Sequence, residues 1–72
     1  METEWINVVM GLNARIVAAE ARFNAQAIAL VETADQGQDT TEAERLLVSH
    51  RRNLVLLRAV QAQLLQDPEA KA

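Results

Sequence analysis

The chain has 72 residues, a mass of 8.0 kDa and a formal net charge of −3, so it allows one small domain. Half of the residues are hydrophobic and 24% are charged, with only two glycines and one proline. This composition excludes a disordered acidic tail, a collagen-like repeat and a low-complexity linker. Cysteine is absent, which excludes a disulfide framework and a thiolate nucleophile.

The first predicted element is a long helix over about residues 4–34. Alanine is abundant in this segment and favours helix through its high propensity. Thr3 is a candidate N-cap, and Glu4 then places a carboxylate at the positive end of the helix dipole. The helix is expected to end before a turn at residues 35–40, where Gly37 can adopt the left-handed conformation that closes a helix.

The second predicted helix covers about residues 41–66 and is followed by a tail over residues 67–72. Two overlapping capping boxes mark its start, Asp39 with Glu42 and Thr41 with Glu44. A connection this short makes the two helices antiparallel neighbours. The sequence therefore predicts an all-α fold, a two-helix hairpin in a single domain.

Each helix carries two apolar stripes at helical spacing, whereas a lone hairpin buries only one stripe per helix. The stripes expected in the hairpin core are Trp5, Val9, Leu12, Ile16, Ala19, Phe23 and Leu30, facing Leu46, Leu47, Leu54, Leu57, Leu64 and Leu65. The second stripes are Ile6, Met10, Val17, Ala21 and Ile28 in the first helix and Val48, Val55, Ala59 and Ala62 in the second. We expect the second stripes to form the interface of a homodimer, giving a four-helix bundle.

Two polar residues interrupt the expected core. Gln26 breaks the stripe of the first helix, and His50 breaks the leucine face of the second. With the turn centred near Gln38, the two lie at equal distances from it along the chain and should face each other. We expect them to approach within hydrogen-bonding or one-water distance and to fix the register of the helices.

Arginines are concentrated away from the ends of the predicted hairpin, while the turn is acidic. The possible contacts for a polyanion are Arg15, Arg22, Arg51, Arg52 and Arg58. The alternative interpretation is that the arginine stems cover the edges of the core and keep their charged ends in water. Exposed aromatic residues for base stacking are not evident, so nucleic acid is not the expected partner.

No set of residues indicates catalysis, a metal site or a cofactor site. His50 has no Asp or Glu three or four residues further on, and Ser49 points to a different face. Gly11 and Gly37 stand alone rather than in a phosphate-binding loop. The acidic start does not suit a secretory signal, and the longest apolar runs span only four residues, so we expect a cytoplasmic protein without a membrane partner.

The expected function is that of a non-enzymatic protein–protein interaction module that self-associates through its second apolar face. In size and hairpin form, the chain resembles the small co-chaperones of type III secretion needle subunits, which implies an alternative: holding a helix of a different protein. It also resembles the plasmid copy-number regulator that binds RNA as a four-helix dimer, which implies a third class. Both likenesses concern architecture and rest on no motif.

Overall fold

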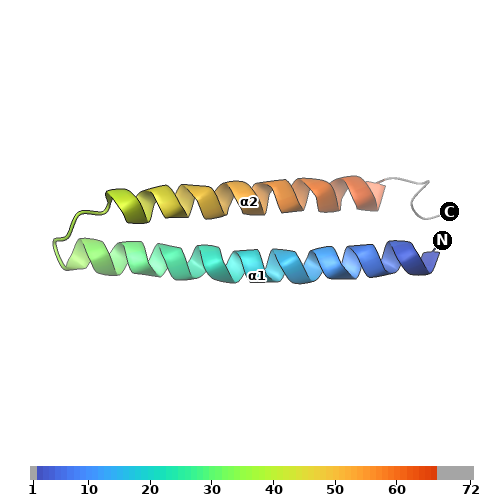
Figure 1. The fold of residues 1–72 in the computed structure, drawn as a ribbon, viewed down its shortest axis with the longest axis horizontal. Helices are drawn as coiled ribbons and strands as arrows, with labels where there is room; N and C mark the ends of the chain where they lie inside the picture. Colours follow the sequence, from blue (N-terminus) through green and yellow to red (C-terminus); the bar gives the residue numbers. More distant parts are fainter. Residues whose placement is uncertain (1, 67–72) are drawn as a thin grey trace.

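Two antiparallel helices make up the fold. The computed structural model describes residues 2–66, which contain α1 (Glu2–Asp35) and α2 (Thr41–Gln66) and no strand. Figure 1 shows the helices side by side, joined at one end by the turn. The hairpin is 55 Å long and 14 by 12 Å across. The predicted hairpin is thus confirmed, and the predicted tail over residues 67–72 lies outside the described residues.

The turn begins with a Schellman motif at the end of α1. Gly37 adopts a φ of 70°, and its N–H donates to the carbonyl of Ala34 at 3.0 Å. The N–H of Gln38 donates to the carbonyl of Thr33 at 3.1 Å. This pair of reversed bonds satisfies carbonyl groups that the end of a helix leaves without partners. The predicted role of Gly37 is confirmed.

The start of α2 is capped one residue away from the predicted arrangement. The first helical bond runs from the N–H of Glu44 to the carbonyl of Thr40 at 2.8 Å, so Thr40 is the N-cap. The Thr40 hydroxyl donates to the Glu44 carboxylate at 3.3 Å. Asp39 Oδ1 instead accepts the N–H of Thr41 at 3.1 Å and its hydroxyl at 2.8 Å.

Neither predicted capping box therefore forms. Asp39 closes a local turn with the residue two places on, a bond that competes with capping at longer range. Glu42 is engaged elsewhere, because Arg45 Nε donates to its Oε2 at 2.9 Å. At the other end of the chain, α1 begins at Glu2, so Thr3 lies inside the helix and is not its N-cap. Shifts of one or two residues at helix ends are common.

The two carboxylates at the start of α2 make the stability of this end depend on pH. The hydrogen bonds from the hydroxyl and N–H of Thr41 lower the pKa of Asp39, and the hydrogen bond from Arg45 lowers that of Glu42. The same contact raises the pKa of Arg45. A carboxyl whose pKa is lower in the folded chain stabilises the fold above its unfolded value, and this contribution disappears as the pH falls through the folded value.

We expect the free energy of unfolding to decrease as the pH falls below about 5, with part of the decrease due to Asp39. Asp39→Asn should make the decrease shallower, because the amide keeps an acceptor oxygen and does not titrate. The control is Asp35→Asn, which removes the same charge from the other side of the turn, where the carboxylate makes no hydrogen bond within residues 2–66. Urea unfolding at several pH values measures the free energy of unfolding. If this free energy falls with pH equally steeply in both variants, Asp39 is not the source of the decrease.

The core of the hairpin is small and lies where the predicted inner stripes meet. The buried residues are Leu12, Ile16 and Ala19 of α1 and Leu54 of α2, with Leu57 and Leu64 packed against them. Trp5, Val9, Phe23 and Leu30 extend this line toward both ends and are half-buried. The predicted inner stripe of α1 is confirmed.

The predicted leucine face of α2 is too broad. Its inner line alternates steps of four and three residues through Ala43, Leu47, His50, Leu54, Leu57, Gln61 and Leu64. Because adjacent residues lie about 100° apart around a helix, only one member of the pair Leu64 and Leu65 can face α1 directly. Leu65 is exposed, which corrects its predicted place in the core.

Gly11 is a position where a substitution should stabilise α1. It is exposed, and a Cβ added there would meet no atom within 4 Å. Gly11→Ala should raise the free energy of unfolding by about 0.5–1 kcal/mol, since glycine inside a helix is less favourable than alanine by about this amount. Gly37→Ala is the contrasting control and should lower it by roughly 1 kcal/mol, because its positive φ suits glycine. Thermal unfolding checks both signs, and destabilisation by Gly11→Ala would show that something packs closely there.

Candidate interaction surface

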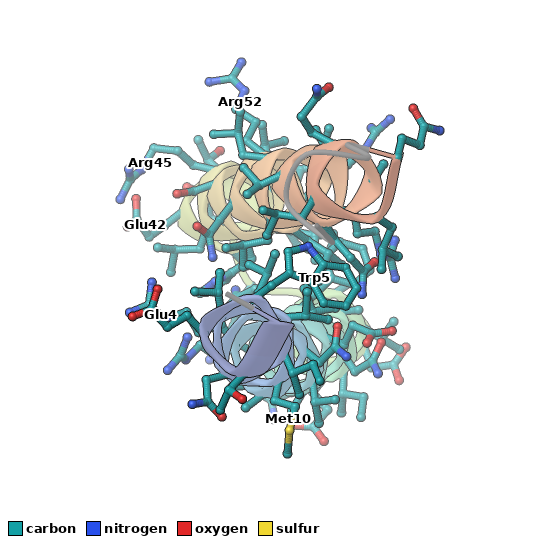
Figure 2. All side chains as sticks on the ribbon, turned by 90° about the vertical axis from the view of Figure 1, so that its right-hand side faces the viewer. Glu4, Trp5, Met10, Glu42, Arg45 and Arg52 are labelled. Atoms are coloured by element: carbon teal, nitrogen blue, oxygen red, sulfur yellow. The ribbon has the colours of Figure 1, made fainter. Side chains whose placement is uncertain are left out.

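Trp5 closes the open end of the hairpin. Its indole Nε1 donates to the carbonyl oxygen of Leu64 at 3.2 Å, and the ring is half-buried. The helical partner of this carbonyl would be the N–H of residue 68, which is a proline and has none. Trp5 therefore satisfies an acceptor that the sequence of α2 leaves open. Figure 2 shows the ring between the two helices.

The predicted pairing of Gln26 with His50 is corrected by the structure. Gln26 Nε2 donates to the carbonyl of Ala43 at 3.2 Å, about two helical turns nearer the start of α2 than His50. Within residues 2–66 no hydrogen bond joins Gln26 to His50, which is half-buried on the inner line of α2. The prediction assumed a symmetric turn, whereas α1 extends past the start of α2 at the turn (Figure 1). This overhang shifts the register of the helices.

Two contacts between the helices define the sides of the hairpin. Arg58 Nη2 donates to Glu20 Oε2 at 3.1 Å, and Gln61 Nε2 donates to Asn13 Oδ1. We call the side that carries Glu20 and Arg58 the ion-pair flank. Seen along α1, Arg15 lies on the other side of the inner line, as does Arg22, and we call that side the arginine flank.

A shallow groove follows the helix boundary on each flank. The groove of the ion-pair flank is lined by Glu20, Phe23, Asn24, Leu54 and Arg58. The grooves of the arginine flank are lined by Arg15, Ala18, Arg22, Asn53 and Leu57 and, nearer the open end, by Asn7, Val8, Gly11, Leu12, Arg15, Val60 and Leu64. The two flanks therefore differ in charge, since the groove of the ion-pair flank contains a carboxylate and the grooves of the arginine flank do not.

The exposed apolar side chains are distributed unevenly between the flanks. Eleven large hydrophobic residues are exposed within the described part of the chain. Steps of three, four and seven residues from Glu20 and Arg58 place seven of them on or beside the ion-pair flank. These seven are Ile6, Met10, Val17, Val31, Val48, Val55 and Leu65. The other four are Val8, Ile28, Leu56 and Val60. The polar contacts of Glu20 with Arg58 and of Asn13 with Gln61 lie between the apolar side chains of the two helices on this flank.

Most residues of the predicted second stripes share this flank. Ile6, Met10 and Val17 lie on it in α1, as do Val48, Val55 and Ala62 in α2. Ala21, Ile28 and Ala59 point away from the hairpin instead, since they lie opposite the inner lines. Figure 2 shows Met10 pointing away from α2. All nine predicted residues are exposed. Their role as a dimer interface stays a prediction.

Sequence reasoning missed two members of this flank. Val31 continues the seven-residue spacing of Met10 and Val17, so its position could have been found from the sequence. Leu65 is seven residues from Arg58, which places it on this flank, although its neighbour Leu64 packs against the core.

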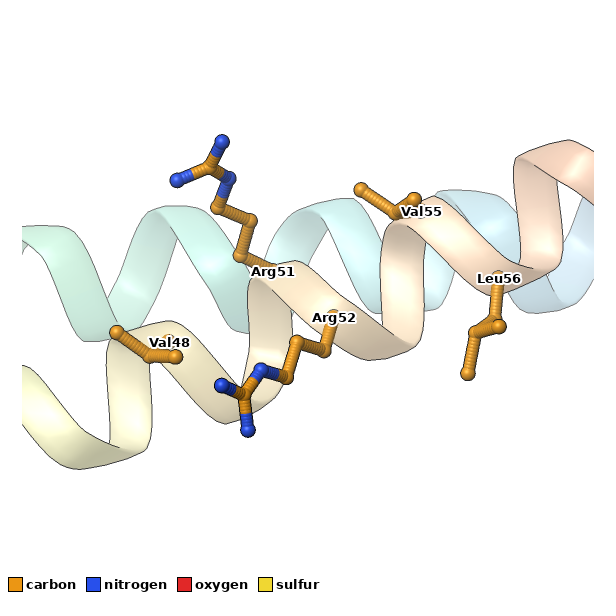
Figure 3. A pocket seen from close by; sticks show the side chains of 5 residues that line it. All are labelled: Val48, Arg51, Arg52, Val55 and Leu56. Atoms are coloured by element: carbon orange, nitrogen blue, oxygen red, sulfur yellow. The ribbon is translucent and has the colours of Figure 1, made fainter.

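A shallow depression lies on the outer side of α2. It is lined by Val48, Arg51, Arg52, Val55 and Leu56, and Figure 3 shows the two arginine side chains pointing in different directions. The two valines belong to the ion-pair flank, and Arg51 borders them. The depression is thus an extension of the exposed apolar surface, with two arginines in its lining.

The predicted polyanion contacts are exposed but do not form one surface. Arg15 and Arg22 lie on the arginine flank, and Arg51 and Arg58 lie on the ion-pair flank. Arg52 points away from α1 in Figure 2. Arg58 is paired with Glu20, and Arg45, which also belongs to α2, is paired with Glu42. The positive charge of the central part is therefore divided among three directions.

Comparison with protein-family models, curated proteins and solved structures finds no match. Neither α1 nor α2 combines the length and hydropathy that a membrane crossing needs, over the part of the chain that the structure describes. Across residues 2–66, no group of three or more His, Asp or Glu side chains is placed to hold a metal ion.

Proposed function

We propose that the protein is a non-enzymatic protein–protein interaction module that self-associates through its ion-pair flank into a four-helix bundle. The observation that carries this proposal is the imbalance between the small core and the exposed apolar surface. Four residues are buried in the hairpin, while seven large hydrophobic side chains lie exposed on or beside one flank. Burying these side chains against a second hairpin supplies the stabilisation that the small core lacks.

Sedimentation equilibrium of the complete chain between 1 and 100 μM tests this proposal. The expected result is a mass of about twice the 8.0 kDa of the chain, with dissociation on dilution accompanied by a loss of helix signal. A folded 8.0 kDa monomer throughout this range would contradict self-association. It would leave the alternative in which the same flank holds a helix of a different protein.

We expect no RNA binding above the non-specific level. A polyanion would meet only two or three arginines at a time, and the aromatic rings of Trp5 and Phe23 are half-buried rather than free to stack on bases. Fluorescence anisotropy with a labelled RNA hairpin in 150 mM salt measures this. Sub-micromolar affinity that falls in Arg51→Gln with a flatter salt dependence would overturn the expectation, and an absorbance ratio at 260 and 280 nm of the purified protein gives an independent check.

A further inference from the structure

We propose that the partner on the ion-pair flank is a second copy of this chain lying in the same direction, so that α1 of each copy packs over α2 of the other. This arrangement brings Arg51 of one copy toward Glu20 of the other. The inference rests on the proposed self-association and adds the face, the direction and the charged contact.

The first argument is the amount of surface that the chain leaves open. Its accessible surface is 5444 Å², whereas a compact monomer of this mass exposes about 4,500 Å². The elongated shape of the hairpin produces this excess, which is large enough for the roughly 800 Å² per partner that a standard stable interface buries. A second copy on one flank therefore fits in size.

The second argument is the symmetry of two hairpins packed flank to flank. A two-fold axis in the plane of the interface allows two directions. If the axis runs along the hairpins, their turns lie at the same end and each α1 covers the α2 of the other copy. If the axis runs across them, the turns lie at opposite ends, α1 covers α1 and α2 covers α2.

The third argument is charge, which separates these two directions. On the ion-pair flank α1 presents one charge near its middle, Glu20. The flank of α2 presents Arg51 and Arg58 near its middle and Glu44, seven residues before Arg51, at the turn end, and α2 contains no acidic residue after Glu44. Packing α2 on α2 would bring these arginines against the same residues of the other copy, and like charges close together at an interface are costly. Packing α1 on α2 instead brings them toward a carboxylate.

Arg51 is the residue that this arrangement provides with a partner. It is exposed, and within residues 2–66 no carboxylate lies within ion-pair distance of it. It is one heptad from Arg58 on the same flank, so it faces the stretch of the other copy's α1 that carries Glu20 and Asn24. The acidic turns of the two copies also come near each other, but they lie at the tip in water, where salt screens charges beyond about 8 Å.

The apolar residues also match in this direction. Leu12 and Val60 line one groove across the helix boundary and Arg15 and Leu57 line another, and the same spacing places Val17 level with Val55. In the proposed dimer, Val17 of each copy packs on Val55 of the other. In the same register, the long flexible side chain of Met10 in one copy lies over the small Ala62 of the other.

The direction can be measured with single-cysteine variants, because the chain has no cysteine of its own. Spin labels on Gln38→Cys in the turns of the two copies should be separated by well under 30 Å, as measured by pulsed electron paramagnetic resonance. This upper bound is roughly half the length of the hairpin. A mixture of Val17→Cys and Val55→Cys should form mixed disulfide dimers under mild oxidation in preference to either variant alone. Turn labels separated by a distance close to the 55 Å hairpin length, with each variant cross-linking only to itself, would overturn the direction.

The flank is tested by a matched pair of substitutions. Val55→Glu on the ion-pair flank and Val60→Glu on the arginine flank change residues that are 56% and 51% exposed. Val55→Glu should raise the dimer dissociation constant at least tenfold, and Val60→Glu should leave it unchanged. The reverse result would refute the ion-pair flank while leaving self-association intact, whereas a monomeric parent protein would refute the proposed function itself.

The charged contact is tested in the same way. Arg51→Glu should weaken association several-fold, because it places a second carboxylate beside Glu20 of the other copy. Arg52→Glu makes the same charge change at the neighbouring residue, whose side chain points away from the hairpin (Figure 2). Equal effects of the two variants would show that only net charge matters and would refute the contact.

Discussion

Leu54→Ala is expected to remove a large part of the stability of the protein, by about 2–5 kcal/mol. Leu54 is 6% exposed and is the buried residue that α2 contributes to the cluster of Leu12, Ile16 and Ala19. Truncating it leaves a cavity at the centre of a core that has few other members. A chain of this length has a total stability of roughly 4–11 kcal/mol, so the loss approaches the size of the whole.

Urea unfolding followed by circular dichroism measures this effect, at one fixed protein concentration because association contributes to stability. The matched control is Leu56→Ala, which removes the same atoms from a side chain that is 66% exposed on the other side of α2. The control should change the free energy of unfolding by no more than about 0.5 kcal/mol. Similar losses in both variants would mean that the core lies elsewhere.

Val17→Glu is expected to abolish self-association and to lower helicity at the same time. Val17 is 65% exposed on the ion-pair flank, one turn before Glu20, and a carboxylate there would be buried without a partner in the dimer. Because four buried residues stabilise the isolated hairpin poorly, dissociation and unfolding should be coupled. The melting temperature of the parent protein should then rise with concentration, and that of the variant should not.

The control for this experiment is Val8→Glu, at a residue that is 54% exposed on the arginine flank. It should keep the mass of the parent protein and the concentration dependence of its melting temperature. The interpretation fails if Val8→Glu dissociates the protein and Val17→Glu does not. A variant that dissociates but stays fully helical would separate association from folding and would contradict the coupling alone.

The hairpin and the inner line of α1 could be predicted because they depend on local rules. The positive φ of Gly37 follows from its place after a long helix, and the steps of four and three residues from Trp5 to Phe23 select the face that is buried. The N-cap at Thr40, in place of the predicted capping boxes of Asp39 and Thr41, leaves the start of α2 at the predicted residue.

The register and the flanks could not be predicted in the same way. Gln26 reaches Ala43 because the residues of the turn are not divided evenly between the helices, and the sequence does not show this overhang. Arg15 and Arg58 lie on opposite flanks although their positions along the hairpin are similar. Assigning them requires knowing which side of α1 adjoins which side of α2, and that information comes from contacts such as Glu20 with Arg58.

The position of Trp5 allows its fluorescence to report on the last step in the folding of the hairpin. Gln26 and Ala43 are separated by 17 residues in the chain, whereas Trp5 and Leu64 are separated by 59. Closing a longer loop costs more entropy, so a chain that zips from the turn reaches the indole last. As the protein has a single tryptophan, its fluorescence follows the final step of hairpin closure, while the circular dichroism signal follows helix formation that precedes it. Stopped-flow refolding with both probes would then show the fluorescence change lagging behind the change in ellipticity.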